Sequence, residues 1–159
     1  MDLQNTATEL FLGIDIGSTT AKIVLRDGDE ILLERYERHF SQVREKTAEL
    51  LRLAKEIAGD KAVKAAISGS AGLGLAEAAH IPFVQEVFAT AQVVKLREPD
   101  TSCVIELGGE DAKIIFFKGG IDERMNGSCA GGTGAFIDQM ATLLNITVDE
   151  LDKLSLNAG

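Results

Sequence analysis

Glycine is concentrated in four short stretches of this sequence, and their placement constrains the fold more than any other feature. The chain has 16 glycines against 2 prolines in 159 residues. The four stretches are LFLGIDIGSTTAKIVL, ISGSAGLG, CVIELGGEDAKIIFF and NGSCAGGTGAF. Each stretch lies at the end of an apolar run or at the start of a helical pattern. Glycine at such junctions permits positive φ and lets backbone N–H groups approach a ligand. The pattern favours ligand-facing loops over plain turns.

Apolar periodicity predicts strands and helices in an α/β order. Residues 10–16, 21–26 and 31–36 are expected to form an antiparallel three-strand meander, with a hairpin turn at Asp27-Gly28-Asp29. The other expected strands are 62–68, 83–84, 102–107, 112–117 and 121–125. The expected helices are 41–58, 73–80, 86–96, 130–144 and a last one that Thr147 and Glu150 open as a capping box.

The order of strand, glycine turn and strand in the first 36 residues recurs after Pro99, with a period of roughly 95 residues. We therefore expect one complete lobe over residues 1–98 and the beginning of a second lobe over residues 99–159. The second lobe lacks its returning strands, so we expect the chain to be the N-terminal part of a longer protein.

Charge and composition exclude several classes of protein. The net charge of −9 leaves no basic face for nucleic acid or an anionic membrane. No apolar run approaches the roughly 20 residues that span a bilayer. The 2 cysteines do not make a disulfide scaffold, so a reducing cytoplasm is the expected location. Cys103 is expected to be a small buried residue, and His39 and His80 are expected at the surface or at helix ends.

Two hairpins carry residues suited to the phosphates of a nucleotide. In the first hairpin, backbone N–H groups and hydroxyls would face a phosphate, and Asp15 would bind Mg²⁺ directly or through water. Its residues are Asp15, Gly17, Ser18, Thr19 and Lys22. The second hairpin repeats this order with Glu106, Gly108, Gly109, Glu110, Asp111 and Lys113. A Walker motif and a dinucleotide fingerprint are both missing. We expect the two hairpins to hold one nucleotide from opposite sides of a cleft.

Three stretches resemble a known family: GIDIGSTTAKIVL, ELGGEDAKIIFF and NGSCAGGTGAFIDQMA. They are similar to the ATP-dependent activators of 2-hydroxyacyl-CoA dehydratases and the ATPase subunits of benzoyl-CoA reductase, the BadF/BadG/BcrA/BcrD type. The resemblance implies an α/β fold of the actin/hexokinase-like (ribonuclease H-like) class with a mixed sheet. It also implies a homodimeric ATPase with one [4Fe-4S] cluster between its subunits. ATP hydrolysis would drive low-potential electron transfer into a partner acyl-CoA dehydratase or reductase.

The resemblance assigns the first cluster ligand to Cys129, at a helix N-terminus where the dipole stabilises a thiolate. The expected nucleotide contacts are Gly17, Ser18, Thr19, Thr20, Lys22, Gly108, Gly109, Lys113, Gly132, Thr133 and Gly134. The expected catalytic residues are Asp15, Glu110 and Asp111. The second cluster cysteine of the family lies beyond position 159, so this chain alone is expected to hold no cluster and to bind nucleotide weakly. The family more often has Asp and Gln in place of Glu106 and Glu110, which predicts slower or lost hydrolysis.

Two alternatives remain open. A sugar or small-metabolite kinase of the same superfamily would need an Asp general base near the second hairpin, and Asp111 fits that role. A non-catalytic nucleotide-sensing module is favoured by Glu106 and Glu110.

Overall fold

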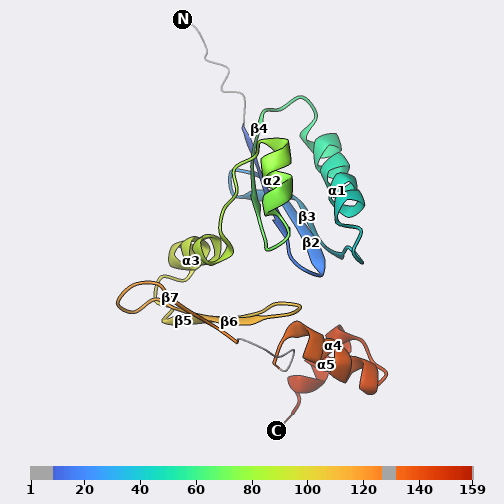
Figure 1. Cartoon of the computed structure of the whole chain (residues 1–159), viewed down its shortest axis with the longest axis vertical. Coiled ribbons are helices and arrows are strands. Elements are labelled where there is room, and N and C mark those ends of the chain that lie inside the picture. The colour runs from blue at the N-terminus through green and yellow to red at the C-terminus, as the bar shows by residue number, and fades with distance from the viewer. Residues whose placement is uncertain (1–8, 127–131, 159) are drawn as a thin grey trace, which may run out of the picture. The chain divides into compact units, whose positions relative to one another are not determined.

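The computed structural model describes residues 9–126 and 132–158. Contacts divide the chain into two units, Met1–Ala89 and Thr90–Gly159, and the division falls inside helix α3 (Glu86–Arg97) (Figure 1). None of the helices described is long and apolar enough to cross a membrane.

The first unit contains a four-stranded sheet in the order β3-β2-β1-β4. Its strands are β1 (Leu10–Ile16), β2 (Thr20–Asp27), β3 (Glu30–Arg38) and β4 (Val63–Ser68). β2 pairs antiparallel with both β1 and β3, whereas β4 runs parallel to β1. The predicted meander is confirmed, and the parallel fourth strand makes the sheet mixed.

One face of this sheet is buried because apolar residues alternate along its strands. Helices α1 (Val43–Ala58) and α2 (Leu73–Ala79) pack against that face (Figure 1). The core they share with the strands includes Leu10, Leu12, Ile14, Ile16, Ala21, Ile23, Leu25, Leu50, Ala54, Ala58, Ile67 and Ala76. This packing places the β1–β2 turn at one end of a rigid sheet.

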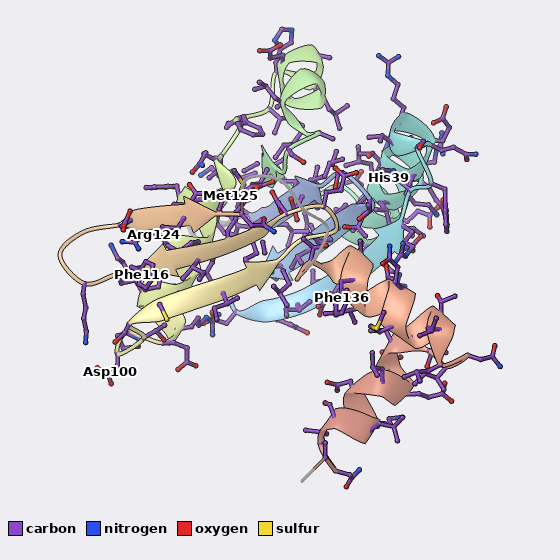
Figure 2. The ribbon with its side chains drawn as sticks, turned by 60° about the horizontal axis from the view of Figure 1, so that its bottom comes forward. His39, Asp100, Phe116, Arg124, Met125 and Phe136 are labelled. Carbon is purple, nitrogen blue, oxygen red and sulfur yellow. The ribbon has the colours of Figure 1, made fainter. Side chains whose placement is uncertain are left out.

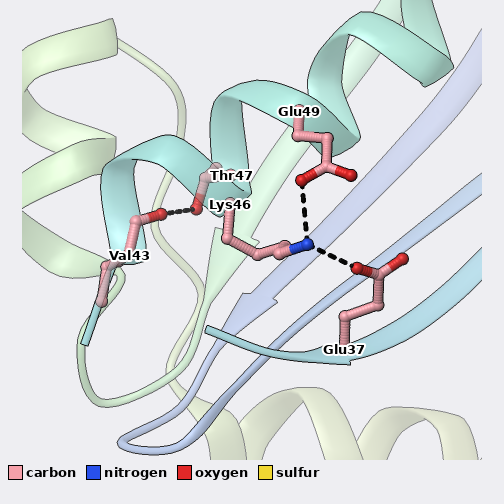
Figure 3. A network of polar contacts seen from close by, with 5 residues as sticks. All are labelled: Glu37, Val43, Lys46, Thr47 and Glu49. Atoms are coloured by element: carbon pink, nitrogen blue, oxygen red, sulfur yellow. Dashed lines mark hydrogen bonds and ion pairs between the residues drawn. The ribbon is translucent and has the colours of Figure 1, made fainter. Parts of the chain in front are cut away.

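Lys46 links α1 to β3. Its ammonium Nζ lies 2.8 Å from Glu37 Oε2 on the strand and 2.8 Å from Glu49 Oε2 on the helix (Figure 3). These hydrogen bonds, first to Glu37 and then to Glu49, raise the pKa of Lys46 above its ordinary value. Beside it, the buried Thr47 hydroxyl donates to the Val43 carbonyl at 2.7 Å. The contacts fix the first turns of α1 against the sheet edge.

The second unit contains an antiparallel sheet in the order β5-β6-β7, followed by two helices. The elements are β5 (Cys103–Leu107), β6 (Ala112–Phe116), β7 (Asp122–Met125), α4 (Gly134–Leu143) and α5 (Val148–Ser155). Across β6 and β7, the Arg124 guanidinium lies 5.2 Å from the centre of the Phe116 ring (Figure 2).

The predicted capping box of the last helix is confirmed. The Thr147 hydroxyl accepts from the Glu150 backbone N–H at 3.2 Å, and the Thr147 N–H donates to Glu150 Oε2 at 2.7 Å. The backbone and side-chain hydrogen bonds from Thr147 hold the pKa of Glu150 below its ordinary value.

Three expectations about local structure need correction. The predicted strand at residues 83–84 is a single parallel bridge between Phe83 and Ile67, because Pro82 precedes it and α3 follows at Glu86. Helix α4 begins at Gly134 and not at residue 130, which lies outside the described residues. Cys103 is exposed and not buried, since it lies on the same exposed face of β5 as Ile105 and Leu107.

Candidate functional site

The first glycine hairpin joins β1 to β2 through residues 17–20. The Gly17 N–H donates to the Thr20 carbonyl at 2.9 Å, which closes the turn. Asp15 lies opposite Lys22 in the strand register, and Lys22 Nζ is 2.6 Å from Asp15 Oδ2. The same Nζ lies 5.3 Å from the centre of the Tyr36 ring on β3. The turn therefore carries an ion pair at its base.

Backbone N–H groups at the tip of this turn are available to a ligand. Across the part of the chain that the structure describes, the N–H groups of Ser18 and Thr19 donate to no chain acceptor. Ser18 is exposed, whereas Thr20 is buried at the start of β2. Adjacent free N–H groups form a concavity that binds anions.

Both sides of the hairpin are supported. On the β4 side, Gly69 packs so closely that an added Cβ would lie 2.2 Å from the Ile16 carbonyl oxygen, and the Ala71 N–H donates to that oxygen at 2.9 Å. On the β3 side, the His39 backbone N–H donates to the Thr19 carbonyl at 3.2 Å. The expectation of a surface or helix-end His39 is wrong, because its side chain is buried against the hairpin.

His80 is exposed and caps the end of α2, as expected.

The second hairpin joins β5 to β6 and has the same construction. The Gly108 N–H donates to the Asp111 carbonyl at 2.8 Å, and Glu106 lies opposite Lys113. Lys113 is only 8% exposed, and its Nζ is 3.5 Å from Asp111 Oδ2. Among the described residues, the N–H groups of Gly109 and Glu110 at the tip have no acceptor.

The N-terminus of α4 packs on this second hairpin. The Gly134 N–H donates to the Gly108 carbonyl at 2.7 Å, and an added Cβ on Gly134 would lie 2.9 Å from that oxygen. Thr133 before it is fully buried, and Gly132 has a φ of +87°. A helix N-terminus carries partial positive charge, so the hairpin and the helix together favour an anion.

Asn126 holds the start of β6, a role that the sequence did not reveal. Its Oδ1 accepts from the Ala112 N–H at 2.9 Å, and its N–H donates to the Ala112 carbonyl at 3.0 Å. Asn126 is also the first residue of the NGSCAGG stretch. The expected cluster ligand Cys129, in that stretch, lies outside the described residues.

The expected site residues fall into two groups, one in each unit. The first unit brings together Asp15, Gly17, Ser18, Thr19, Thr20 and Lys22. The second brings together Gly108, Gly109, Glu110, Asp111, Lys113, Gly132, Thr133 and Gly134. In the described ranges, no three His, Cys, Asp or Glu side chains converge as a metal site.

Comparison with known proteins matches these features to one family. Residues 12–159 match the BadF/BadG/BcrA/BcrD ATPase family. The chain is 30% identical over 157 residues to the 2-hydroxyisocaproyl-CoA dehydratase activator of Clostridioides difficile, covering 92% of this chain and 57% of that protein. It is 33% identical over 151 residues to the (R)-2-hydroxyglutaryl-CoA dehydratase activating ATPase of Acidaminococcus fermentans, covering 90% of this chain and 56% of that protein.

A solved structure agrees with the sequence comparison. The Clostridium difficile activator of 2-hydroxyisocaproyl-CoA dehydratase with bound ADPNP superimposes with a TM-score of 0.78 at 28% identity, covering 94% of this chain and 57% of that one. This likeness confirms the expected actin/hexokinase-like ATPase fold. The chain spans little more than half the length of the curated relatives it matches.

Proposed function

Because the chain belongs to the BadF/BadG/BcrA/BcrD ATPase family, we propose that its two glycine hairpins bind the phosphates of ATP. The observation that carries the proposal is their shared construction. Each hairpin closes from a glycine N–H to the carbonyl three residues on, and each sets a carboxylate opposite a lysine. Free N–H groups and ammonium groups are the donors that phosphate oxygens accept. The relative with bound ADPNP supports the nucleotide class.

In the first hairpin, Lys22 is the charged donor. Its side chain is about one-third exposed, so its ammonium can turn from Asp15 toward a phosphate oxygen. The Ser18 and Thr19 N–H groups and hydroxyls supply neutral donors beside it, and Gly17 keeps the backbone accessible. Thr20, buried at the start of β2, holds the far end of the turn in place.

Asp15 is the proposed Mg²⁺ contact, and its surroundings fit that role. Lys22 occupies only the Oδ2 side of its carboxylate, and the side chain is partly exposed. Mg²⁺ at nucleotide sites takes one or two carboxylates and completes its shell with phosphate oxygens and water. A bound Mg²⁺ would polarise the phosphate oxygens as a Lewis acid.

In the second hairpin, Gly108 and Gly109 let the backbone approach a phosphate. The buried Lys113 supplies positive charge from strand β6, next to the turn. The α4 N-terminus at Gly132, Thr133 and Gly134 adds dipole charge, because Gly134 is bonded directly to the hairpin.

We assign Glu110 and Asp111 to the hydrolytic step, since both lie on the second hairpin turn. Glu110 is exposed at the tip, where its carboxylate can accept a proton from or orient an attacking water. The Asp111 carboxylate next to Lys113 is the observation that keeps a metabolite kinase as second candidate, because a kinase needs an Asp to accept the proton of the substrate hydroxyl.

The wider activity we propose follows the relatives. The protein would serve as an ATP-fuelled activator of an acyl-CoA dehydratase or reductase, and two relatives are named as activators of 2-hydroxyacyl-CoA dehydratases. Cys129 would ligate a [4Fe-4S] cluster, and a homodimer would bring two such thiolates of the four that this cluster takes. The cluster would supply electrons at low potential to the partner enzyme.

Nucleotide binding is tested by calorimetric titration of the chain with ADPNP and Mg²⁺. Lys22→Met should weaken the affinity about tenfold, because one charge-assisted hydrogen bond is lost. Lys55→Met, on the exposed side of α1, is the matched control and should leave the affinity unchanged. Equal affinity in both variants would contradict the role of the first hairpin.

The activator and kinase proposals predict different reaction products and a different visible absorption of the protein. An activator releases free phosphate from ATP, whereas a kinase transfers it to an added sugar. A full-length form that also carries the family's second cluster cysteine, isolated without oxygen, should show a broad visible absorption that disappears in Cys129→Ala and persists in Cys103→Ala. A colourless protein that phosphorylates a sugar would overturn the activator proposal.

A further inference from the structure

His39 is the one buried histidine among the described residues, and both its backbone and its ring contact the first hairpin. It follows directly after β3 (Figure 2). Only 5% of its surface is exposed. Its backbone N–H donates to the Thr19 carbonyl at 3.2 Å. Its ring Nε2 lies 3.1 Å from the Gly17 carbonyl oxygen. Two of the four residues in the hairpin turn are thus bonded to one histidine.

The hydrogen-bond partners define the tautomer of the ring. The Gly17 carbonyl can only accept, so Nε2 must carry a hydrogen and donate it. The Ser41 N–H can only donate, and it lies 3.2 Å from Nδ1, so Nδ1 must be unprotonated. The two contacts therefore assign the ring hydrogen to Nε2, with Nδ1 as the acceptor.

The turn after His39 is strained in a way that maintains this arrangement. Phe40 and Ser41 are both non-glycine residues with positive φ, at 47° and 65°. The Gln42 N–H donates to the His39 carbonyl at 2.7 Å and closes the turn. Two consecutive left-handed residues are unfavourable, so they persist only where surrounding contacts require them. Here they bring the Ser41 N–H to the ring.

Peptide planarity passes this constraint to the ligand-facing groups. The Gly17 carbonyl and the Ser18 N–H belong to one trans peptide plane and point in opposite directions. A ring that holds the Gly17 carbonyl inward therefore directs the Ser18 N–H outward, where the structure gives it no chain acceptor among the described residues. The bond from the His39 N–H to the Thr19 carbonyl fixes the peptide plane that joins Thr19 to Thr20. The two bonds therefore hold the peptide planes on either side of the Ser18–Thr19 peptide.

We propose that His39 is a positioning residue that orients the Ser18 N–H of the first hairpin toward a bound phosphate through the hydrogen bond from Nε2 to the Gly17 carbonyl. The binding part of this inference rests on the proposed nucleotide function. The orienting part does not, because the bond and the hairpin exist in the chain without nucleotide.

The first experiment is nitrogen NMR of the 159-residue chain without nucleotide. The His39 ring should show hydrogen on Nε2 and none on Nδ1, and the Ser18 and Thr19 amides should be rigid, with order parameters of about 0.85. In His39→Leu these order parameters should fall below about 0.6. A hydrogen on Nδ1, or rigid amides in the leucine variant, would overturn the proposal.

The second experiment measures ADPNP affinity with three variants. His39→Leu should bind about tenfold more weakly, and His39→Gln should restore most of that loss, because its side-chain amide can donate to the Gly17 carbonyl. His80→Asn is the matched control, since His80 is exposed with a φ of 54° that Asn adopts readily. Affinity unchanged in His39→Leu would overturn the positioning role.

Failure of the chain to bind nucleotide and failure of a variant to fold can each be told apart from failure of the His39 proposal. If the wild-type chain bound no ADPNP, the proposed function would fail while the NMR result would still decide the role of His39. If His39→Leu did not fold, the tautomer of the wild-type chain and the order parameters of His39→Gln would decide it.

Discussion

Gly69→Ala is the substitution whose effect the structure defines most sharply. Gly69 follows β4 with a φ of +96°, and an added Cβ would lie 2.2 Å from the oxygen, 2.4 Å from the carbon and 2.5 Å from the nitrogen of Ile16. All three are backbone atoms at the end of β1, so no side chain can rotate away. The backbone conformation costs about 1–3 kcal/mol and the overlap about 1–3 kcal/mol more, which gives a loss of about 2–6 kcal/mol in the free energy of unfolding.

Substitutions at two other glycines separate the cost of the backbone conformation from the cost of the steric overlap. Gly28 has a φ of +56° with nothing within 4 Å of an added Cβ, so Gly28→Ala measures the cost of the backbone conformation alone. Gly13 lies inside β1 at a negative or extended φ, again with nothing within 4 Å. Gly13→Ala should therefore stabilise the chain by about 0.5–1 kcal/mol, because glycine loses more entropy in a strand.

The assay is urea unfolding of the three variants followed by circular dichroism, with hydrogen exchange of the β1 amides to report on the first unit. The expected order of stability is Gly13→Ala, wild type, Gly28→Ala and then Gly69→Ala. A Gly69→Ala chain no less stable than Gly28→Ala would refute the argument from close packing. The displaced Ile16 should also disturb Gly17, so ADPNP affinity should fall with stability.

Three further predictions concern packing and charge. Leu50→Ala should cost about 2–5 kcal/mol because Leu50 is fully buried, whereas Leu156→Ala, at 79% exposure, should change the unfolding free energy by less than about 0.5 kcal/mol. Lys46→Met should destabilise the chain less in high salt than in low salt, because its two ion pairs are partly exposed. The pKa of Glu150 is lowered on folding, so its stabilisation is complete above its unfolded pKa and is lost as the pH falls through the folded one. Glu150→Gln should therefore differ from wild type in thermal unfolding at about pH 7 and much less at about pH 3.

The strands and their turns were predictable because their signals are local. The hairpin at 17–20 lies between two apolar runs of alternating burial, and the Thr147 capping box is a pattern over four residues. The cross-strand match of Asp15 with Lys22 and of Glu106 with Lys113 also follows from a repeated sequence order. These features need no knowledge of distant contacts.

The role of His39 was not predictable because it depends on long-range register. β3 pairs with β2 so that Arg38 faces Thr20, which carries the next residue to the hairpin. An isolated histidine after a mixed-charge stretch gives no sign of this pairing. The exposure of Cys103 also depends on distant contacts, since strand propensity does not say which face of the sheet is covered. For His39, a prediction of the register between β2 and β3 would have been the signal.

The two hairpins have the same construction, but their lysines differ in burial. This difference gives the two lysines different roles. The side chain of Lys22 is 36% exposed, whereas that of Lys113 is 10% exposed. A partly solvated lysine keeps its rotamer freedom and can exchange a carboxylate for a phosphate. A buried lysine is held by its surroundings, so its removal leaves the groups it compensates without their charge partner. Loss of Lys113 therefore lowers stability together with binding, whereas loss of Lys22 acts mainly on binding. For this reason a substitution of Lys22, and not of Lys113, measures the contribution of such a lysine to nucleotide affinity without a change in stability.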